Sequence, residues 1–379
     1  MSVALAVVGD ATDPATFGGL PWHMLEAGQA QGVIGRGLRL GPMPSDGLHR
    51  AAWTAGRLLR HGERGGFQYS PGFLRRLYAR DPLRPGEDVL SIFQLMPEAV
   101  FRGPGRRFFY IDQTLRQLFE TYGEAHGVGA RARDAAIARE TAQYRASDGV
   151  ICQSAYAKRD VVWRYGVAED RVHVVLPGAN LSRDILARHD AGGLREPTPG
   201  PLRLVFVGKD WRRKGLDRLI GGMTAALAGG AEVVLDVIGV AEGSVPAALR
   251  VPGVRYAGFV DKRDDRFAAM LAGADVGCLL SRAEAGGISL REFAALGLPT
   301  LAPDTGGSPE YVVTGASTLI PPDAGDAEIG RAIHALATDR SRLAAERRTA
   351  WAARHEARWD RAIAAIGAIL DGLPRGAGR

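Results

Sequence analysis

The stretch that decides the fold spans residues 275–303 and reads DVGCLLSRAEAGGISLREFAALGLPTLAP. An apolar strand pattern, DVGCLLS, is followed by a helical pattern that begins after Gly287, and then by a second strand pattern, PTLAP. A strand, a helix and a strand in this order predict a parallel pair, because parallel neighbours need a long crossover connection. Ser289-x-x-Glu292 has the spacing of a capping box, which predicts that these two residues open the helix.

The same alternation of strands and helices continues on both sides of this stretch. Further strand patterns lie at 3–8, 87–95, 106–112, 149–154, 171–179, 202–208, 232–239 and 254–260, and helical patterns at 21–30, 130–146, 155–166, 215–228 and 265–274. Residues 191–201, AGGLREPTPGP, interrupt the alternation and have the composition of a linker. The sequence therefore predicts an α/β protein with two similar halves, in which ligands bind beyond the carboxyl ends of the strands.

The composition is that of an ordinary soluble enzyme with two domains. Of the 379 residues, 46% are apolar and 24% are charged, and no apolar run approaches the roughly 20 residues that a membrane-spanning helix needs. The initial MSVALAVVGDATD lacks basic residues and is typical of a strand rather than a secretion signal. Cys152 and Cys278 form no metal-ligand spacing. We therefore expect a cytoplasmic protein with reduced thiols.

The net charge of +6 comes largely from arginines that are scattered along the chain. A nucleic-acid surface would need a sustained basic stripe with interleaved aromatic residues, so the sequence predicts no nucleic-acid partner. The basic excess leaves two other interpretations open, an anionic substrate and a peripheral contact with an anionic membrane surface.

Two loops at predicted strand ends carry the chemistry. In VFVGKDWRRKGLD, residues 205–217, Lys209 and Lys214 flank the loop before a helix. Ammonium groups beside the first amides of a helix suit a diphosphate, although surface loops often carry lysines without binding anything. In the second loop, a carboxylate at Glu284 can accept hydrogen bonds from the vicinal hydroxyls of a sugar, and the glycines after it let a ligand approach the backbone.

A third loop, APDTGGSPEYV at 302–312, has Ser308 in the place of a helix N-cap and Pro309 in the first turn. Pro is tolerated there because the amide that it lacks has no helical partner. This loop favours a structural role.

These motifs resemble a known family. GKDWRRKGLD, GFVDK and SRAEAGGISLREFAALGLPTLAPDTGGSPEYV, in this order, look like the C-terminal domain of glycosyltransferase family 4, whose members are retaining enzymes of the GT-B fold. That family typically shows G-R-x-x-x-x-K-G-x-D, then E-G-F-G-x-x-x-x-E-A, then D-x-G-G-x-P-E. More weakly, TFGGLPWHMLEAG at 16–28 resembles the glycine loop of the N-terminal domain, and residues 152–180 resemble its last Rossmann unit.

The resemblance implies a GT-B fold, with two Rossmann-like domains that face a central cleft. The first would cover residues 1–190 together with a C-terminal helix, about 355–379, that crosses back to it, and the second would cover 200–354. It also implies transfer of a hexose-type sugar, with retention of configuration, from a UDP- or GDP-sugar to a hydroxyl acceptor of a glycan, a glycolipid or a natural product. The nucleotide sugar is a co-substrate, and no metal and no other cofactor is expected.

Roles follow residue by residue for the second domain. Lys209 falls where the family has arginine and Lys214 where it has lysine, and together they would bind the donor diphosphate. Glu284 would accept from hydroxyls of the donor sugar, and Glu292 from hydroxyls of the ribose. The remaining positions would present backbone to the donor: Val260 to the base, and Gly286, Gly287 and Ile288 to the sugar and phosphates.

In the first domain, Gly18 and Gly19 would close over the diphosphate, and the nearby His23 could face the donor or be an ordinary structural histidine. Many family members have a histidine near a donor hydroxyl where this chain has Asp112. Asp112 could act near the anomeric centre or could cap the helix that begins at Thr114. The family's Gly-Phe after the first glutamate is Ala285-Gly286 here, which changes the shape of the sugar pocket.

Two other functions stay open at this point. A nucleotide-sugar epimerase or hydrolase of the same fold is one, and a nucleotide-sugar-binding protein without catalysis is the other. The acceptor would bind to variable loops such as 40–80 and 102–108, whose basic and aromatic residues fit an anionic or lipid-linked acceptor and a small natural product equally well. An enzyme with a lipid-linked acceptor would work at the inner face of the membrane.

Overall fold

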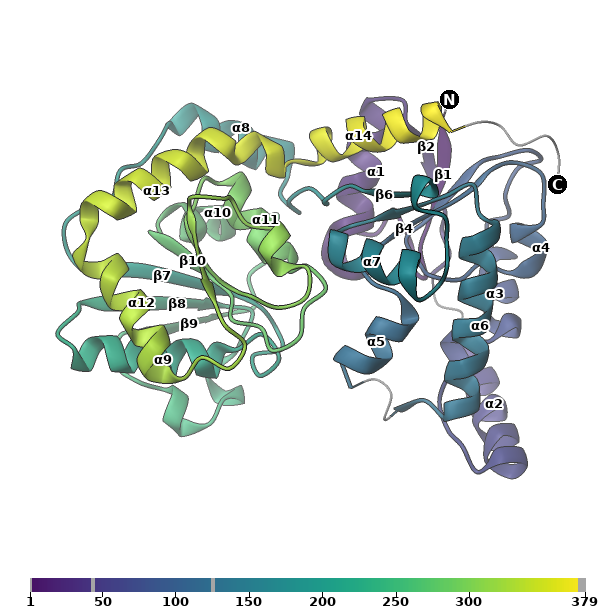
Figure 1. Cartoon of the computed structure of the whole chain (residues 1–379), viewed down its shortest axis with the longest axis horizontal. Coiled ribbons are helices and arrows are strands. Elements are labelled where there is room, and N and C mark those ends of the chain that lie inside the picture. Colours follow the sequence, from purple (N-terminus) through teal and green to yellow (C-terminus); the bar gives the residue numbers. More distant parts are fainter. Residues whose placement is uncertain (1, 42–44, 124–126, 374–379) are drawn as a thin grey trace. The chain divides into compact units, whose positions relative to one another are not determined.

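The computed structural model describes residues 2–41, 45–123 and 127–373. The chain divides into two compact units, Met1–Leu176 with Ala362–Arg379, and Pro177–Arg361. Within the described residues, each unit is built around one parallel sheet of six strands (Figure 1). The predicted α/β class with two parallel-sheet halves is therefore confirmed. No described helix is long and apolar enough to cross a membrane.

The first unit has the strand order β2-β1-β3-β4-β5-β6, and all neighbouring strands are parallel. Its strands are β1 (Val3–Ala6), β2 (Ile34–Gly37), β3 (Val89–Ser91), β4 (Arg107–Ile111), β5 (Gly149–Cys152) and β6 (Val172–Val174). Its helices are α1 (Leu20–Ala30), α2 (Asp46–His61), α3 (Pro71–Tyr78), α4 (Glu98–Phe101), α5 (Leu115–Thr121), α6 (Ala130–Ala146) and α7 (Ala155–Trp163), with 3₁₀ turns η1 (Thr16–Gly19), η2 (Phe67–Tyr69) and η4 (Glu169–Arg171).

The centre of this unit is β4, whose five residues are all buried. Such a strand is apolar on both sides because helices cover both faces of a parallel sheet. Its one charged residue is Arg107, whose guanidinium is hydrogen-bonded to backbone carbonyls. It donates to those of Val100 and Pro104 at 2.7 Å each. A buried charge costs little only when it is hydrogen-bonded in this way.

A buried carboxylate supports the helix that follows β4. Glu140 of α6 is fully buried and accepts from the Leu115 amide, with oxygens at 3.0 and 3.1 Å, and from the Tyr165 hydroxyl. Burial raises the pKa of Glu140 to about 8, although these hydrogen bonds act to lower it. The N-cap of α5 is Thr114, which forms a capping box with Gln117.

The second unit has the strand order β12-β11-β10-β7-β8-β9, again with all neighbours parallel. Its strands are β7 (Leu202–Val207), β8 (Val233–Ile238), β9 (Val254–Gly258), β10 (Val276–Cys278), β11 (Thr300–Pro303) and β12 (Ser317–Ile320). Its helices are α8 (Arg183–Gly192), α9 (Leu216–Ala228), α10 (Asp265–Ala272), α11 (Ile288–Ala295), α12 (Asp326–Thr338) and α13 (Arg340–Ala353), with 3₁₀ turns η5 (Glu242–Ser244), η6 (Ala247–Leu249), η7 (Ser308–Glu310) and η8 (Arg354–Ala357).

This order places the first strand of the unit in the middle of its sheet. From β7 the chain winds outward through β8 to β9 on one side, and then through β10 and β11 to β12 on the other. The loops after β7 and β10 therefore leave neighbouring strands in opposite directions. That opening is the topological switch point, where doubly wound sheets bind ligands.

The last helix, α14 (Trp359–Gly372), belongs to both units. At its start, the Trp359 indole donates to the Asn180 side chain at 3.2 Å within the second unit. From Ala362 the helix packs into the first unit, where Arg106 donates to the Leu370 carbonyl at 2.6 Å. Residues 374–379 of the expected C-terminal helix lie outside the described residues.

Two local predictions are wrong. Ser308 does not cap a helix, because Ser308–Glu310 is a single 3₁₀ turn whose N-cap is Gly307. The segment 40–80, interpreted above as variable loops, contains the sixteen-residue α2 and the eight-residue α3.

Candidate functional site

The site begins where two loops of the second unit join at the switch point. The loop after β7 carries Lys209 to Lys214, and the loop after β10 carries Glu284. Backbone hydrogen bonds hold the loops together, from the Arg282 amide to the Arg213 carbonyl at 2.8 Å and from the Leu280 amide to the Lys214 carbonyl at 3.3 Å. Parallel pairing of β7 with β10 puts both loops at the same edge of the sheet. The structure thus joins two of the predicted motifs.

Glu284 is the centre of this junction. One of its carboxylate oxygens accepts from the Lys214 ammonium at 3.0 Å, from the Ser281 hydroxyl at 3.1 Å and from the Arg213 guanidinium at 3.3 Å. Burial raises the pKa of Glu284, but the charges of Lys214 and Arg213 outweigh it, and the pKa lies below its ordinary value. Glu284 is therefore a fixed carboxylate anion at neutral pH.

Lys209, at the start of the loop 209–214 (the lysine loop), lies beside an aromatic ring and outside this ion pair. Its side chain is exposed, and its ammonium lies 4.9 Å from the centroid of the Phe259 ring, within cation–π range. Phe259 and the buried Val260 belong to the loop after β9. Lys209 is thus next to the segment that the family resemblance assigns to the nucleobase.

The helix α11 begins at Ile288, and its N-cap is Gly287, with φ +86°. The predicted capping box of Ser289 and Glu292 is wrong: the Ser289 hydroxyl is buried and has no hydrogen-bond partner among the described residues. The reason is local, since the left-handed conformation of Gly287 turns the chain into the helix before Ser289. The first amides of α11, which lack helical partners by position, follow directly after the glycine pair.

Residues of the third loop support this turn. A Cβ at Gly286 would lie 2.1 Å from the ring of Tyr311, and a Cβ at Gly306 would lie 1.9 Å from the Glu284 carbonyl oxygen. The loop after β11 is therefore packed directly against the Glu284 loop. Its structural role agrees with the sequence interpretation.

Glu292 lies on α11 and is fully buried. One carboxylate oxygen accepts from the ammonium of Lys262, in the loop after β9, and the other has no hydrogen-bond partner among the described residues. Burial raises the pKa of Glu292, and the charge of Lys262 offsets only part of this effect. A buried acceptor without a partner is rare in proteins and calls for an explanation. The pairing with Lys262 was not predicted, since no sequence pattern links the two loops.

The remaining predicted residues belong to the first unit. Gly18 and Gly19 have φ of +65° and +91° in the turn before α1, and His23 is buried on α1 with its ring 4.7 Å from that of Trp22. Asp112 follows the carboxyl end of β4 directly. These residues lie in loops or first turns after the strands of their own sheet, as expected for a ligand-binding edge.

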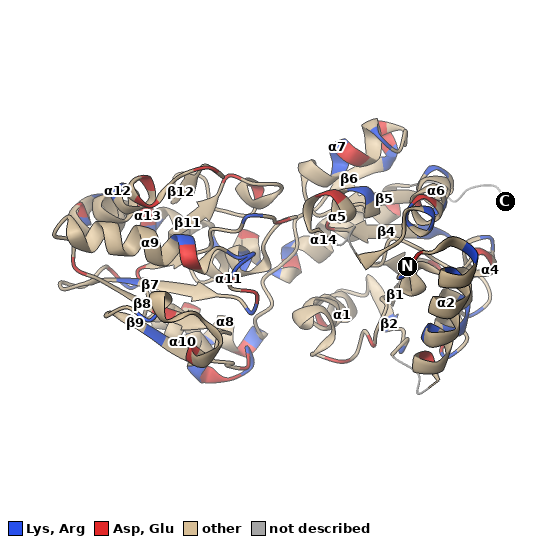
Figure 2. Cartoon of the chain, turned by 90° about the horizontal axis from the view of Figure 1, so that it is seen from below, with Lys and Arg blue, Asp and Glu red and all other residues tan. Residues whose placement is uncertain are grey.

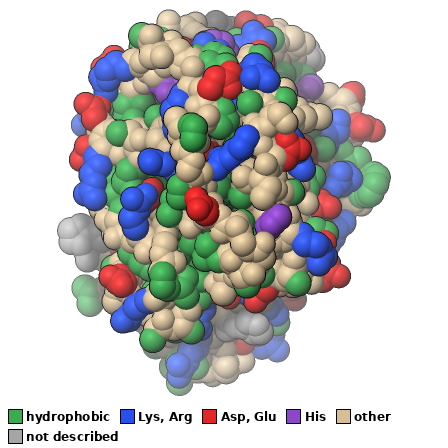
Figure 3. Space-filling model, turned by 90° about the vertical axis from the view of Figure 1, so that its left-hand side faces the viewer, with side chains coloured by type: hydrophobic (Ala, Val, Ile, Leu, Met, Phe, Trp, Pro, Cys, Tyr) green, Lys and Arg blue, Asp and Glu red, His purple; other side chains and the backbone are tan. Residues whose placement is uncertain are grey.

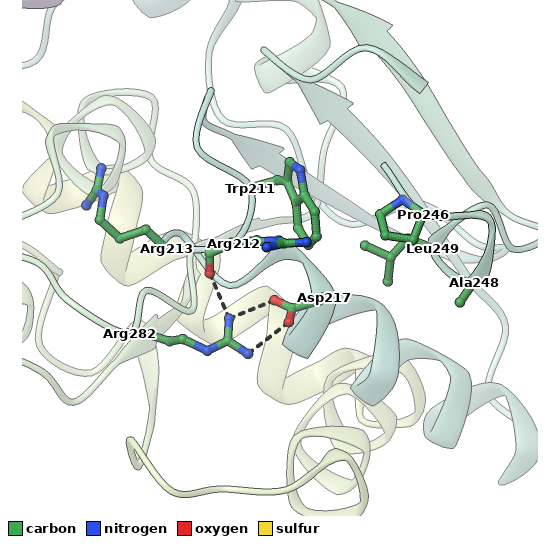
Figure 4. Close-up of a pocket in the computed structure, with 8 residues that line it drawn as sticks. All are labelled: Trp211, Arg212, Arg213, Asp217, Pro246, Ala248, Leu249 and Arg282. Carbon is green, nitrogen blue, oxygen red and sulfur yellow. Dashed lines mark hydrogen bonds and ion pairs between the residues drawn. The ribbon is translucent and has the colours of Figure 1, made fainter. Parts of the chain in front are cut away.

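A pocket of about 550 Å³ lies on the lysine loop and was not predicted (Figure 4). Its lining includes Trp211, Arg212, Leu249 and the ion pair between Arg282 and Asp217, whose two contacts are both 2.8 Å. Arg282 also donates to the Arg212 carbonyl at 2.7 Å. The pair therefore connects the loop after β10 to the lysine loop and to the start of α9. Trp211 and Arg212 lie within the quoted lysine-loop stretch, but no sequence motif marks them as the lining of a pocket.

The surface of the second unit in Figure 3 shows acidic and basic side chains mixed, without a basic stripe on that face. Among the described residues, no group of three or more His, Cys, Asp or Glu side chains lies close enough together to hold a metal ion.

Comparison with known families decides the identity of both units. The family model "Glycosyl transferases group 1" matches residues 201–339, which include the whole lysine and glutamate site, and the model "Glycosyltransferase Family 4" matches residues 112–183 of the first unit. The chain thus carries domains of both glycosyltransferase models. The predicted family is therefore confirmed.

Two curated relatives of this chain are both D-inositol 3-phosphate glycosyltransferases. The protein from Nocardia farcinica is 29% identical over 213 residues, which are 52% of this chain and 46% of the relative. The protein from Xylanimonas cellulosilytica is 30% identical over 243 residues, 58% of this chain and 56% of the relative. The match thus spans about half the length of each relative.

Among solved structures, HepE of Anabaena in complex with UDP and glucose is similar over 98% of this chain and 100% of HepE. The TM-score is 0.64 and the sequence identity 15%. This likeness shows the fold, which is GT-B. The substrate roles assigned above to individual residues remain predictions.

Proposed function

We propose that this chain is a retaining hexosyltransferase that moves a hexose from a UDP- or GDP-sugar to a hydroxyl acceptor. The observation that carries the proposal is the pairing of Lys214 with Glu284 at the switch point of the second unit. This pairing puts a cation for the diphosphate and a carboxylate for sugar hydroxyls side by side, next to the N-terminus of α11.

The reaction breaks the bond between the anomeric carbon and the diphosphate oxygen and forms a bond from the acceptor oxygen to that carbon. The departing diphosphate gains negative charge, which Lys214, Lys209 and the first amides of α11 are suited to stabilise. Because these fixed positive groups can take the place of a divalent ion, we propose that transfer needs no metal. The acceptor proton leaves with the departing diphosphate or with solvent.

Glu284 has the role of a hydroxyl acceptor in this proposal, not of a nucleophile. Three donors already hold one of its oxygens, so the carboxylate is fixed in place and its basicity is low. Retention then follows from attack and departure on the same face of the sugar, without a covalent intermediate. The Glu292 oxygen that lacks a partner is suited to accept from a ribose hydroxyl.

The first unit supplies four further residues to the proposal. Gly18 and Gly19 have the open backbone that a diphosphate needs, and His23 lies one turn further along α1. Since Thr114 caps α5, Asp112 is not required as that helix's N-cap, and we assign it a role near the anomeric centre.

The relatives support particular substrates for the first tests. The curated relatives are named for D-inositol 3-phosphate, an anionic acceptor with hydroxyls, and solved structures of HepE contain UDP and UDP-glucose. We therefore propose UDP-glucose as the first donor to test and an anionic polyol as the first acceptor. We place the enzyme in the cytoplasm and, where its acceptor is lipid-linked, at the inner face of the membrane.

The test is a screen of UDP- and GDP-hexoses with inositol phosphates and with glycolipid extracts, with and without EDTA. We expect nucleotide release that depends on acceptor, is unchanged by EDTA and yields a product whose anomeric configuration, measured by NMR, equals that of the donor. Nucleotide release without any glycoside product would instead indicate a hydrolase or epimerase. Binding without turnover of any donor would indicate a non-catalytic protein.

A further inference from the structure

Two arginines tie the lysine loop to the Glu284 loop, which follows β10, and each reaches from its own loop to the backbone of the other. The Arg213 guanidinium, on the lysine loop, donates to the Ala283 carbonyl at 3.0 Å. In the opposite direction, the Arg282 guanidinium donates to the Arg212 carbonyl at 2.7 Å. We call these reciprocal contacts the arginine clasp. A shift of one loop against the other would break contacts from both sides.

A carboxylate orients each guanidinium of the clasp. Two N–H groups of Arg282 donate to the two carboxylate oxygens of Asp217 at 2.8 Å each, and one of them also reaches the Arg212 carbonyl (Figure 4). Arg213 donates to the carboxylate of Asp210 at 3.3 Å, within the lysine loop. Since a bidentate pair fixes the plane of a guanidinium, the clasp is oriented by the protein itself.

The contacts of the clasp lie next to the two residues that the proposed function uses most. Arg213 directly precedes Lys214 in the chain, and Ala283 directly precedes Glu284. The Arg213 guanidinium also donates to the Glu284 carboxylate at 3.3 Å, beside the Lys214 ammonium at 3.0 Å. A displacement of about 1 Å in an active site can lower a rate about a hundredfold. The clasp therefore acts where a small displacement matters to the reaction.

The ribbon in Figure 2 shows charged residues spread over both units rather than gathered at one place. The clasp is thus set apart from other charged residues by its contacts, not by a local excess of charge.

The exposure of the Arg282 side chain indicates that it positions the loops rather than stabilises the unit. The side chains of Arg282 and Asp217 are 48% and 32% exposed, and ion pairs this exposed contribute little to the free energy of unfolding. The strands beneath the two loops, β7 and β10, pair directly with each other. Loss of Arg282 should therefore loosen the loops and leave the sheet intact.

We propose that Arg213 and Arg282 are positioning residues, which hold Lys214 and Glu284 in the relative place that sugar transfer needs. Neither arginine is assigned a contact with the donor, since both act through the lysine loop and the Glu284 loop. The inference rests on the proposed function for its role in the reaction. The clasp itself can be measured without any ligand.

The first test compares amide hydrogen exchange in full-length Arg282→Met and in the wild type. The amides of Leu280 and Arg282 donate to carbonyls of the lysine loop, so they report whether the two loops stay together. We expect exchange at positions 280 and 282 to be about tenfold faster in the variant, because the loops open more easily without the side-chain contacts. Exchange in β7 should be unchanged.

The second test is kinetic and uses the most active donor of the screen described above, together with the free nucleotide that this donor carries. In Arg282→Met we expect kcat to fall about tenfold or more. The Kd for the free nucleotide should change less than about threefold, since Lys209 and Glu292, which the proposed function assigns to the nucleotide, lie outside the clasp. A wild-type binding stoichiometry would show that the loss of kcat is not due to unfolded protein.

Two further variants separate the parts of the clasp. Arg282→Lys keeps the charge but loses the bidentate fork, so its kcat should lie between those of Arg282→Met and the wild type. Arg213→Met should show the same faster exchange and a larger fall in kcat, because Glu284 also loses a cation.

Arg255→Met is the matched control. Arg255 makes the same bidentate pair with Asp236, at 2.7 and 2.8 Å, between β9 and β8 of the same unit. This variant should leave kcat and exchange at positions 280 and 282 unchanged.

Three outcomes would overturn the proposal: wild-type exchange at positions 280 and 282 in either Met variant of the clasp, wild-type kcat in Arg282→Met, or equal losses in Arg255→Met. A wild type that transfers from no donor of the screen would instead refute the proposed function, and the role of the arginines in transfer with it. The exchange comparison then still decides whether the arginines hold the loops. The two failures are thereby distinguished.

Discussion

The ammonium of Lys214 lies 3.0 Å from the carboxylate of Glu284, although 70 positions separate the two residues in the chain. The pair connects the loops of β7 and β10, the two neighbouring strands from which the chain of the second unit winds in opposite directions. A cation and an anion are thus held in a fixed relation, which the proposed binding of one donor by both residues would use. Pre-arranged charge of this kind lowers the cost of reorganisation during a reaction.

Removing the cation from this pair should affect both activity and stability. In Lys214→Met we expect turnover of the donor to fall by about a hundredfold or more, because a positive group is lost where the leaving diphosphate gains charge. The free energy of unfolding should fall by about 1–3 kcal/mol, since Glu284 stays buried with Arg213 as its one remaining cation. Steady-state kinetics and urea unfolding measure the two effects.

Lys158→Met is the matched control, because Lys158 pairs with the exposed Glu169 at 3.4 Å on the surface of the first unit. It should leave both quantities nearly unchanged. Wild-type turnover in Lys214→Met would show that the lysine does not act on the diphosphate.

Glu292 should separate ligand binding from stability. In Glu292→Gln we expect the Kd for UDP or GDP to rise about tenfold, as a charged acceptor for a ribose hydroxyl becomes neutral. The free energy of unfolding should be unchanged or slightly higher, because burial already disfavours the charged form, as its raised pKa shows. Calorimetric titration and thermal unfolding are the measurements. An unchanged Kd with altered stability would mean that Glu292 is purely structural and would count against a nucleotide-sugar site.

Gly306 of the third loop should be needed for both stability and donor binding. Gly306 has φ +59°, and a Cβ there would lie 1.9 Å from the Glu284 carbonyl oxygen. Gly306→Ala should therefore lower the free energy of unfolding by about 2 kcal/mol or more and weaken donor binding by displacing the Glu284 loop. Gly243→Ala is the control, since nothing lies within 4 Å of its Cβ position. Equal stability of the two variants would show that the loop adapts freely.

Glu140 predicts a dependence of stability on pH. Its pKa is raised from 4.5 to about 8 in the folded protein by burial, so between these pH values the unfolded chain has lost a proton that the folded protein still holds. Stability from this group is fully present below about pH 4.5 and is lost as the pH rises towards 8. Glu140→Gln removes the titration and keeps an acceptor for the Leu115 amide.

Wild type and Glu140→Gln should thus differ in their response to pH. Between pH 5 and pH 8 we expect the free energy of unfolding of the wild type to fall by a few kcal/mol relative to that of the variant. The melting temperature of the wild type should fall accordingly. Parallel melting curves at all pH values would contradict a buried, protonated Glu140.

The parts of the molecule that could be predicted from sequence are those that local rules determine. The strands β7 and β10 are largely apolar, and the lysine and glutamate loops have motifs whose order and spacing are those of the family. The capping box failed because the conformation of Gly287, which no pattern specifies, begins the helix before Ser289. The pairing of Glu292 with Lys262 could not be predicted for another reason, because Lys262 approaches from a separate loop through tertiary packing alone.

The helix α2 was missed although its spacing was visible. Leu48, Ala55 and Leu59 follow a helical period, but the intervening arginines and the short apolar side chains make the segment resemble a surface loop. Sequence analysis expects an apolar stripe to face a core. Here the apolar stripe faces outward and the aromatic Trp53 faces the unit, an arrangement that only the structure reveals.

Phe17 gives the last prediction, because it combines strain with exposure in the glycine loop of the first unit. It has φ +46°, the one positive value for a non-glycine residue among the described residues, and its side chain is 61% exposed. Phe17→Gly should raise the free energy of unfolding by up to about 1 kcal/mol, since the left-handed conformation costs a side chain about 1–2 kcal/mol and glycine loses part of this gain to entropy. Phe17→Ala, which loses the ring but keeps the strain, should be less stable than Phe17→Gly. Strain persists mostly where function uses it, so turnover should fall in both variants, and full activity in Phe17→Gly would show that the loop does not need the ring.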